Sequence, residues 1–257
     1  MKPRESSFPD FGKEASDDRT LRGFSHDALR DSCPQLSGQT DLDSKDSDCN
    51  DQQVWKDTSR PTHFLALRIT NEEIVRMVGQ VQAHMLKIQP LYSPCCIPSS
   101  ALHITLCTLG LDTPDQVAHA VEVLHRIQPQ LATSLPHTPL RVDGVDTFFN
   151  RVVYAKVQQQ PEFMEFVDHL KLLLWESGVE MRDVHHGYTP HVTIMKATKP
   201  LVNQKGTKDV DPSLYKDYTD MYFGQQTLDR VYLCTMGGSK REDGFYECLG
   251  EIEFGQA

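Results

Sequence analysis

Two short segments carry the residues best suited to chemistry. Residues 103–106 read His-Ile-Thr-Leu and residues 191–194 read His-Val-Thr-Ile. Successive side chains of a strand point to opposite faces, so each histidine shares a face with its threonine, while the two apolar residues share the other face. Of the eleven histidines, only these two are followed at that spacing by a hydroxyl residue and then an apolar one. The pair predicts two half-buried strands that each contribute half of an active site.

These residue types favour phosphoryl chemistry. Histidine titrates near neutral pH, so a facing pair can combine one neutral general base with one protonated general acid. Threonine hydroxyls on the same face can donate to phosphoryl oxygens without adding charge. In-line attack at phosphorus needs such groups on both sides, and hydrolysis of a 2′,3′-cyclic phosphate or a 2′-5′ linkage fits this requirement. The set needs no metal and no cofactor.

The segments before the first histidine predict a strand and an amphipathic helix. The apolar run 63–69 is typical of a strand, and Thr70 with Glu73 forms a capping-box pattern at a helix start. Apolar residues then recur every three or four positions as far as Ile88, and Pro90 ends the pattern. A loop leads from there into the first histidine strand.

A second helix and a closing hairpin are also expected. Thr113 is a suitable N-cap, Pro114 suits the first helical position, and the helix is predicted to end near Pro129. Near the end of the chain, residues 230–236 and 245–249 predict two strands of a hairpin.

The strand, helix and histidine strand then recur. Residues 139–149 and 151–158 predict two strands with Asn150-Arg151 as the tight turn, and a helix follows from Pro161 to a cap at Gly178. The histidine lies 39 residues after Phe64 in the first unit and 38 residues after Val153 in the second. This spacing indicates a duplicated architecture.

Two lobes follow from the duplication. They correspond roughly to residues 60–150 and 151–257, with exchange of strands allowed between them, and together they form a domain of residues 58–257. In each lobe we expect a sheet with helices on one face, so that the two histidine strands meet across a cleft.

Composition bounds the function classes. Residues 1–57 hold 8 Lys and Arg against 13 Asp and Glu and predict a disordered acidic tail, which accounts for half of the net charge of −10. No basic groove for long duplex nucleic acid is expected, so nucleotides or RNA ends are the favoured substrates. Seven cysteines without a Cys-x-x-Cys pair, no signal-peptide core and no long apolar run favour a cytoplasmic or nuclear protein that is not in a membrane.

Further segments extend the motif pair into a family resemblance. Residues 188–196, residues 211–215 with Phe223-Gly224, and residues 233–236 resemble the A-kinase anchor protein 7 nuclear-signal domain, a branch of the two-histidine (2H) phosphoesterase superfamily. The resemblance covers about residues 60–255. It implies an α+β, bilobal and pseudo-symmetric fold with two antiparallel-type sheets flanked by helices around a central cleft.

The resemblance also implies the roles of the site residues. It indicates metal-independent phosphodiesterase activity with His103 and His191 as the catalytic pair and Thr105 and Thr193 holding the phosphate. Tyr188 enters the second motif directly and is a candidate for stacking on a base. Hydrolysis of 2′,3′-cyclic phosphates of nucleotides or RNA ends is the predicted reaction.

Several alternatives stay open or are disfavoured. Cleavage of 2′-5′ oligoadenylate is the second candidate reaction, and a non-catalytic module that binds nucleotides or RNA ends is the candidate from another class. A metal cluster of His185, His186 and His191 is disfavoured, because a turn leading into a strand offers no fixed ligand geometry. Kinase anchoring is not expected, since only residues 251–257 follow the last predicted strand. We expect a monomer.

Overall fold

The described strands all belong to one antiparallel sheet. A computed structural model describes residues 60–182, 187–198, 201, 203, 206–207 and 209–255, so the expected acidic tail lies outside the described residues. The strands are β1 (His63–Arg68), β2 (His103–Leu109), β3 (Leu140–Phe148), β4 (Val152–Val157), β5 (His191–Lys196), β6 (Tyr222–Gln226), β7 (Arg230–Thr235) and β8 (Cys248–Glu253). Their order across the sheet is β6-β3-β4-β5-β2-β1-β7-β8.

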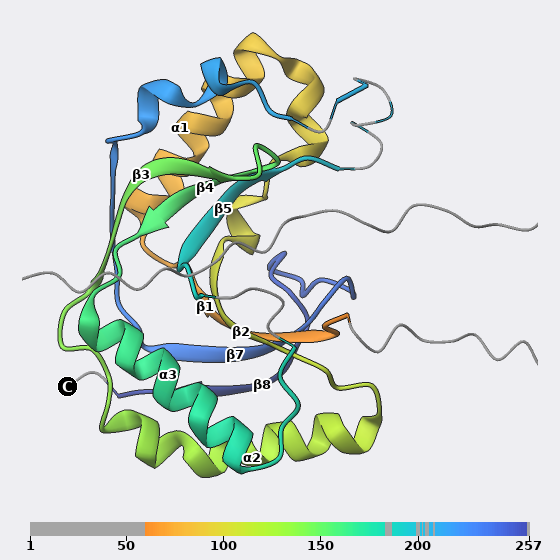
Figure 1. Cartoon of the computed structure of the whole chain (residues 1–257), viewed down its shortest axis with the longest axis vertical. Coiled ribbons are helices and arrows are strands. Elements are labelled where there is room, and N and C mark those ends of the chain that lie inside the picture. The colour runs from red at the N-terminus through yellow and green to blue at the C-terminus, as the bar shows by residue number, and fades with distance from the viewer. Residues whose placement is uncertain are drawn as a thin grey trace, which may run out of the picture. The chain divides into compact units, whose positions relative to one another are not determined.

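The sheet consists of two four-stranded halves. β2 and β5 meet at its centre through one register pair, Ile104 opposite Val192, whereas β1 with β2 and β4 with β5 form longer ladders. The two sheets expected from the sequence are therefore continuous, but only through this minimal contact (Figure 1).

Strands and helices are exchanged between the halves. β7 and β8 come late in the chain yet join β1, whereas β3 precedes β4 and joins β6, so the halves of the sheet do not follow the sequence ranges 60–150 and 151–257. Helix α1 (Glu72–Ile88) follows β1 but contacts β5 and β6. Helix α3 (Pro161–Glu176) follows β4 but packs on α2 (Pro114–Ala132), which contacts β8 (Figure 1).

The start of α1 differs by one residue from the prediction. Asn71, not Thr70, is the N-cap, and its side-chain oxygen accepts a hydrogen bond from the Ile74 N–H at 3.1 Å. The Thr70 hydroxyl instead accepts from the Gln226 amide at 3.1 Å. A contact with β6 therefore decides which of two suitable residues caps the helix.

Helix α2 begins as predicted but extends further. The prediction of Thr113 as N-cap with Pro114 in the first turn is confirmed, and Gln116 completes a capping box that was not predicted. Pro129 does not end the helix, which continues to Ala132 and buries Leu131 completely. Proline inside a helix loses one N–H donor and crowds the carbonyl four residues earlier, and burial of Leu131 in the last turn offsets part of this cost.

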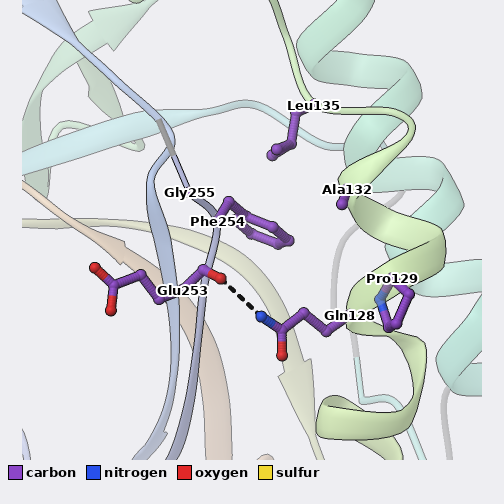
Figure 2. Close-up of a pocket in the computed structure, with 7 residues that line it drawn as sticks. All are labelled: Gln128, Pro129, Ala132, Leu135, Glu253, Phe254 and Gly255. Carbon is purple, nitrogen blue, oxygen red and sulfur yellow. Dashed lines mark hydrogen bonds between the residues drawn. The ribbon is translucent and has the colours of Figure 1, made fainter. Parts of the chain in front are cut away.

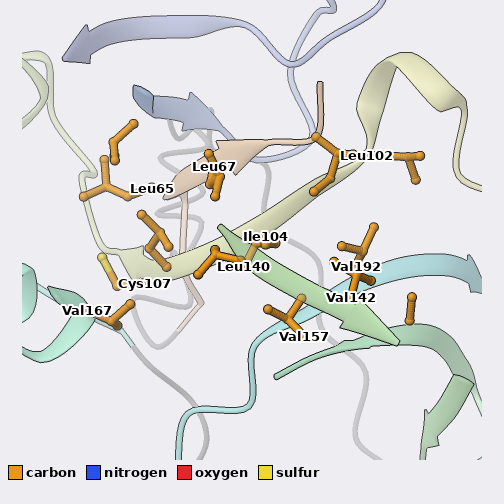
Figure 3. Packing of buried hydrophobic residues seen from close by; sticks show 14 of the residues in the cluster. Leu65, Leu67, Leu102, Ile104, Cys107, Leu140, Val142, Val157, Val167 and Val192 are labelled. Carbon is orange, nitrogen blue, oxygen red and sulfur yellow. The ribbon is translucent and has the colours of Figure 1, made fainter. Parts of the chain in front are cut away.

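The core lies on the side of the histidine strands that the sequence pattern predicts. Ile104 and Val192 are fully buried, among apolar residues from both halves of the sheet (Figure 3). Leu65 and Leu67 of β1 and Val157 of β4 belong to the same cluster. Burying these side chains fixes the register of β2 and β5, because a shift by one residue would turn the histidines into the core.

The hairpin between β3 and β4 turns one residue earlier than predicted. The Arg151 N–H donates to the Phe148 carbonyl at 2.9 Å, so the central residues are Phe149 and Asn150, both with positive φ (52° and 54°). Asparagine tolerates this left-handed conformation, whereas phenylalanine is strained in it. The prediction of Asn150-Arg151 was therefore wrong by one position.

The C-terminal strand also starts later than expected, because β8 begins at Cys248 and not at Phe245. In the part of the chain described by the structure, no helix combines the length and apolar character needed to cross a bilayer.

Candidate active site

The two motifs form one cross-strand cluster. Because Ile104 lies opposite Val192 in an antiparallel pair, the register sets His103 opposite Thr193 and Thr105 opposite His191. All four side chains are half-buried, on the face of the sheet away from Ile104 and Val192. A local two-fold axis between β2 and β5 thus relates one motif to the other, and the histidines occupy diagonal positions across it.

Both imidazoles are held in the same way. Nδ1 of His103 lies 2.8 Å from the Ala101 carbonyl oxygen, and Nδ1 of His191 lies 2.8 Å from the Thr189 carbonyl oxygen. A carbonyl oxygen can only accept, so each Nδ1 carries the proton and donates. In the neutral ring, Nε2 then holds the lone pair. Neither Nε2 has a hydrogen-bond partner among the described residues, which leaves both available to a ligand.

Aromatic rings surround His103. Its ring centroid lies 5.1 Å from that of Phe64 on β1 and 5.0 Å from that of Tyr246, which meets it edge-on. Lys240 lies beyond, with Nζ 3.2 Å from the centre of the Tyr246 ring. Burial lowers the pKa of His103 to about 4; the positive charges of His191 and Lys240 add to this, and the bond to Ala101 opposes it. His103 is therefore neutral at physiological pH.

His191 has a matching aromatic setting on the other half of the sheet. Phe148 at the end of β3 and Tyr154 on β4 meet its ring edge-on, at centroid distances of 4.9 and 5.3 Å. Burial lowers the pKa of His191, and the hydrogen bond to Thr189 opposes this shift. Among the residues that the structure describes, no lysine adds to this shift, whereas Lys240 adds to the shift of His103. The two histidines are thus alike in geometry and unlike in electrostatics.

The threonine hydroxyls are free to bind a ligand. Within the ranges that the structure describes, neither Thr105 nor Thr193 makes a side-chain hydrogen bond, although both are half-buried. A half-buried hydroxyl without a protein partner can donate to an incoming anion at little cost. Together with the two free Nε2 atoms, the hydroxyls form a set of four polar groups on one surface.

Tyr188 links the two motif strands. Its hydroxyl donates to the Thr105 carbonyl at 3.0 Å, its ring lies 6.4 Å from that of Phe163, and Lys171 Nζ lies 5.0 Å from the ring centre. These contacts tie the segment that precedes His191 to β2. Base stacking by Tyr188 remains a prediction, and the rings next to His191 are those of Phe148 and Tyr154.

Sequence reasoning did not identify Phe64, Tyr246 and Lys240 as neighbours of His103. Tyr246 and Lys240 face each other across an isolated bridge in the segment between β7 and β8, far from His103 in sequence. No local motif marks them. His185 and His186 lie outside the described residues, and among those described no group of three or more His, Cys, Asp or Glu could hold a metal ion.

A pocket elsewhere lacks the chemistry of this site. It lies between the C-terminal part of α2 and the end of β8, where the Gln128 amide donates to the Glu253 carbonyl at 2.7 Å (Figure 2). Pro129, Leu135 and Phe254 supply most of its remaining lining. It contains neither imidazole nor hydroxyl groups, so the histidine cluster is the better candidate.

Comparisons with solved structures find proteins that share this fold. A crystal structure of a phosphoesterase covers 76% of this chain and 99% of its own chain, with a TM-score of 0.51 and 16% identity. LigT of E. coli complexed with 3′-AMP matches 76% and 99%, with a TM-score of 0.50 and 17% identity. Both likenesses concern the fold alone.

A family model identifies the family of this chain. The chain belongs to the AKAP7 2'5' RNA ligase-like domain family, whose model matches residues 61–254. The human A-kinase anchor protein 7 isoform gamma is 28% identical over 203 residues, which are 77% of this chain. The match covers 58% of the length of that relative.

Proposed function

We propose that this domain is a metal-independent phosphodiesterase that hydrolyses 2′,3′-cyclic phosphates of nucleotides or RNA ends. The observation that carries the proposal is the juxtaposition of two His-x-Thr motifs by the Ile104–Val192 pair, with both Nε2 atoms and both hydroxyls lacking hydrogen-bond partners among the described residues. Diagonal positions on adjacent antiparallel strands are roughly 7–8 Å apart, which leaves room for a phosphoryl group between the imidazoles. Membership of the family supports the same class of reaction.

The electrostatic difference between the histidines suggests how they divide the work. Because the pKa of His103 is about 4, its ring is neutral near pH 7, and its Nε2 is suited to take a proton from the attacking water. The water oxygen bonds to phosphorus as the bond to one ribose oxygen breaks. Protonated His191 then supplies a proton to that oxygen. Afterwards His103 releases its proton to solvent and His191 takes one up from solvent. The hydroxyls of Thr105 and Thr193 donate to the non-bridging oxygens.

Purified protein tests the proposal directly. In the presence of EDTA, it should open adenosine 2′,3′-cyclic phosphate to a monophosphate, and His103→Ala and His191→Ala should each reduce the rate at least 100-fold, because general acid–base catalysis contributes about 10²–10⁴-fold. His125→Ala is the matched control, since His125 is exposed on α2. Full activity in either site variant would refute the mechanism.

The same preparation distinguishes the alternatives. Faster turnover of 2′-5′ linked adenylate than of the cyclic phosphate would replace the proposed substrate by the second candidate. Binding of 3′-AMP without turnover of either compound, with His103→Ala abolishing the binding, would identify a non-catalytic module at the same site.

A further inference from the structure

Two cysteines face each other next to the His103 site. Cys234 on β7 and Cys248 on β8 are direct register partners, both are free, and their Sγ atoms lie 3.7 Å apart. Directly opposed residues of antiparallel strands have Cα atoms about 4.5–5.5 Å apart, within the range that a disulfide spans. To form a disulfide, the sulfur atoms must approach from 3.7 Å to about 2 Å.

The environment makes one of these thiols reactive. Cys248 is half-buried, and its pKa is lowered to about 7, chiefly because the Cys234 thiol hydrogen-bonds to it and also because the Arg241 guanidinium lies beside it; burial opposes both. Cys234 is fully buried, and its pKa is raised. An accessible thiolate beside a buried thiol is the arrangement of an attacking and a resolving cysteine.

The other described cysteines lack this arrangement. Burial raises the pKa of the Cys96 thiol, with the neighbouring Cys95 adding to the effect. Cys107 is buried in the main apolar cluster. Within the described residues, only Cys234 and Cys248 combine a direct cross-strand pairing with thiol contact.

We propose that Cys234 and Cys248 form an oxidative modification site that takes a hydroperoxide. The Cys248 thiolate attacks the peroxide oxygen, the O–O bond breaks, and Cys248 becomes a sulfenic acid while the peroxide is reduced to an alcohol or water. The Cys234 sulfur then attacks the Cys248 sulfur and water leaves. Two thiols are oxidised to one disulfide and one hydroperoxide is reduced, so atoms and electrons balance.

The disulfide changes the packing around His103. In the thiol form, Cys248 donates to the Tyr246 carbonyl at 3.2 Å, and the Tyr246 ring packs against His103. Both cysteines belong to a small apolar cluster that includes Phe64, the other ring against His103. Oxidation removes the donor to Tyr246 and draws β7 and β8 together at this point. The rings that pack against His191 belong to Phe148 and Tyr154, which lie on β3 and β4 and not on β7 or β8.

Mass spectrometry of the folded full chain tests the proposal. After brief exposure to hydrogen peroxide and alkylation of the remaining thiols in urea, five of the seven cysteines should carry the label. The intact mass should be lower by two hydrogens before alkylation, and a peptide linking residues 234 and 248 should appear and disappear with dithiothreitol. Cys107→Ser should form the same link, whereas Cys234→Ala should accumulate sulfenic or sulfinic acid at Cys248.

Two outcomes would overturn the proposal. One is sulfinic acid at Cys248 in the parent chain while Cys234 is still alkylated. The other is a linked peptide that forms only after urea unfolding. The imidazole NMR signals report the effect on the site independently of any catalysis: oxidation should shift those of His103 more than those of His191. Equal shifts would refute the connection to His103.

Discussion

The depressed pKa of His103 makes a specific contribution to the pH dependence of stability. Its ordinary value is 6.5 and its value in the folded protein is about 4, so between these limits the unfolded chain binds a proton that the folded chain does not. The free energy of unfolding therefore falls as the pH drops below 6.5 and levels off below 4. At pH 5, the difference in protonation amounts to about 2 kcal/mol.

The substitution His103→Gln removes this titrating imidazole and therefore tests the contribution of its lowered pKa to stability. Urea unfolding of the parent chain and the variant at pH 7.5 and pH 5.0 gives a double difference in which all other titrating groups cancel. We expect the variant to lose less stability between the two pH values by about 1–2 kcal/mol, because the half-buried ring keeps some contact with solvent.

A matched control and a direct measurement accompany this test. His125→Gln makes the same chemical change at an exposed position of α2 and should give no comparable double difference. An NMR titration of His103 in the parent chain should show a midpoint well below 6.5. A double difference below about 0.5 kcal/mol, with a midpoint near the ordinary value, would refute the argument from burial.

Three further outcomes are expected. The pH profile of kcat/KM should be bell-shaped with its optimum between about pH 4 and 6.5. The reason is that His103 must be neutral, whereas His191, whose pKa is also lowered, must be protonated. A flat profile from pH 5 to 8 would contradict the paired mechanism. Thr105→Val and Thr193→Val should each weaken binding of 3′-AMP in calorimetry about 10–100-fold without lowering the urea midpoint. Phe149→Asn should raise the free energy of unfolding by about 0.5–1 kcal/mol, because Phe149 has positive φ and is 80% exposed, and Phe149→Ala should gain less.

Patterns within a few residues of one another predict the parts of the fold that depend on neighbouring residues in the sequence. The alternation in the two His-x-Thr segments places their apolar residues in the core, and the structure buries Ile104 and Val192 accordingly. The Thr113 capping box and the left-handed Gly178 after α3 are likewise signals within a few residues of the element they delimit. Equal spacing of the repeated unit was sufficient to relate the two histidine strands.

The features that the sequence patterns did not predict depend on contacts between residues far apart in the chain. Strand β6 was not predicted, because Tyr-Phe-Gly-Gln-Gln has no clear alternation and forms an edge of the sheet by pairing with β3. Its Gln226 in turn engages Thr70 and leaves Asn71 to cap α1. The aromatic neighbours of His103 depend on the return of β7 to β1, which no local pattern encodes.

The local two-fold axis between β2 and β5 has a consequence for substrate polarity. A site whose two motifs are interchangeable would accept a phosphodiester in either chain direction, and either ribose oxygen could then serve as the leaving group. The chain direction of the phosphodiester would therefore be recognised by residues that differ between the two sides of the site. Lys240 contributes positive charge beside His103, whereas no lysine of the described residues contributes to the pKa shift of His191. If the proposed phosphodiester is the substrate, its chain direction would be selected by groups outside the two motifs, and Lys240 of the segment between β7 and β8 is the described candidate.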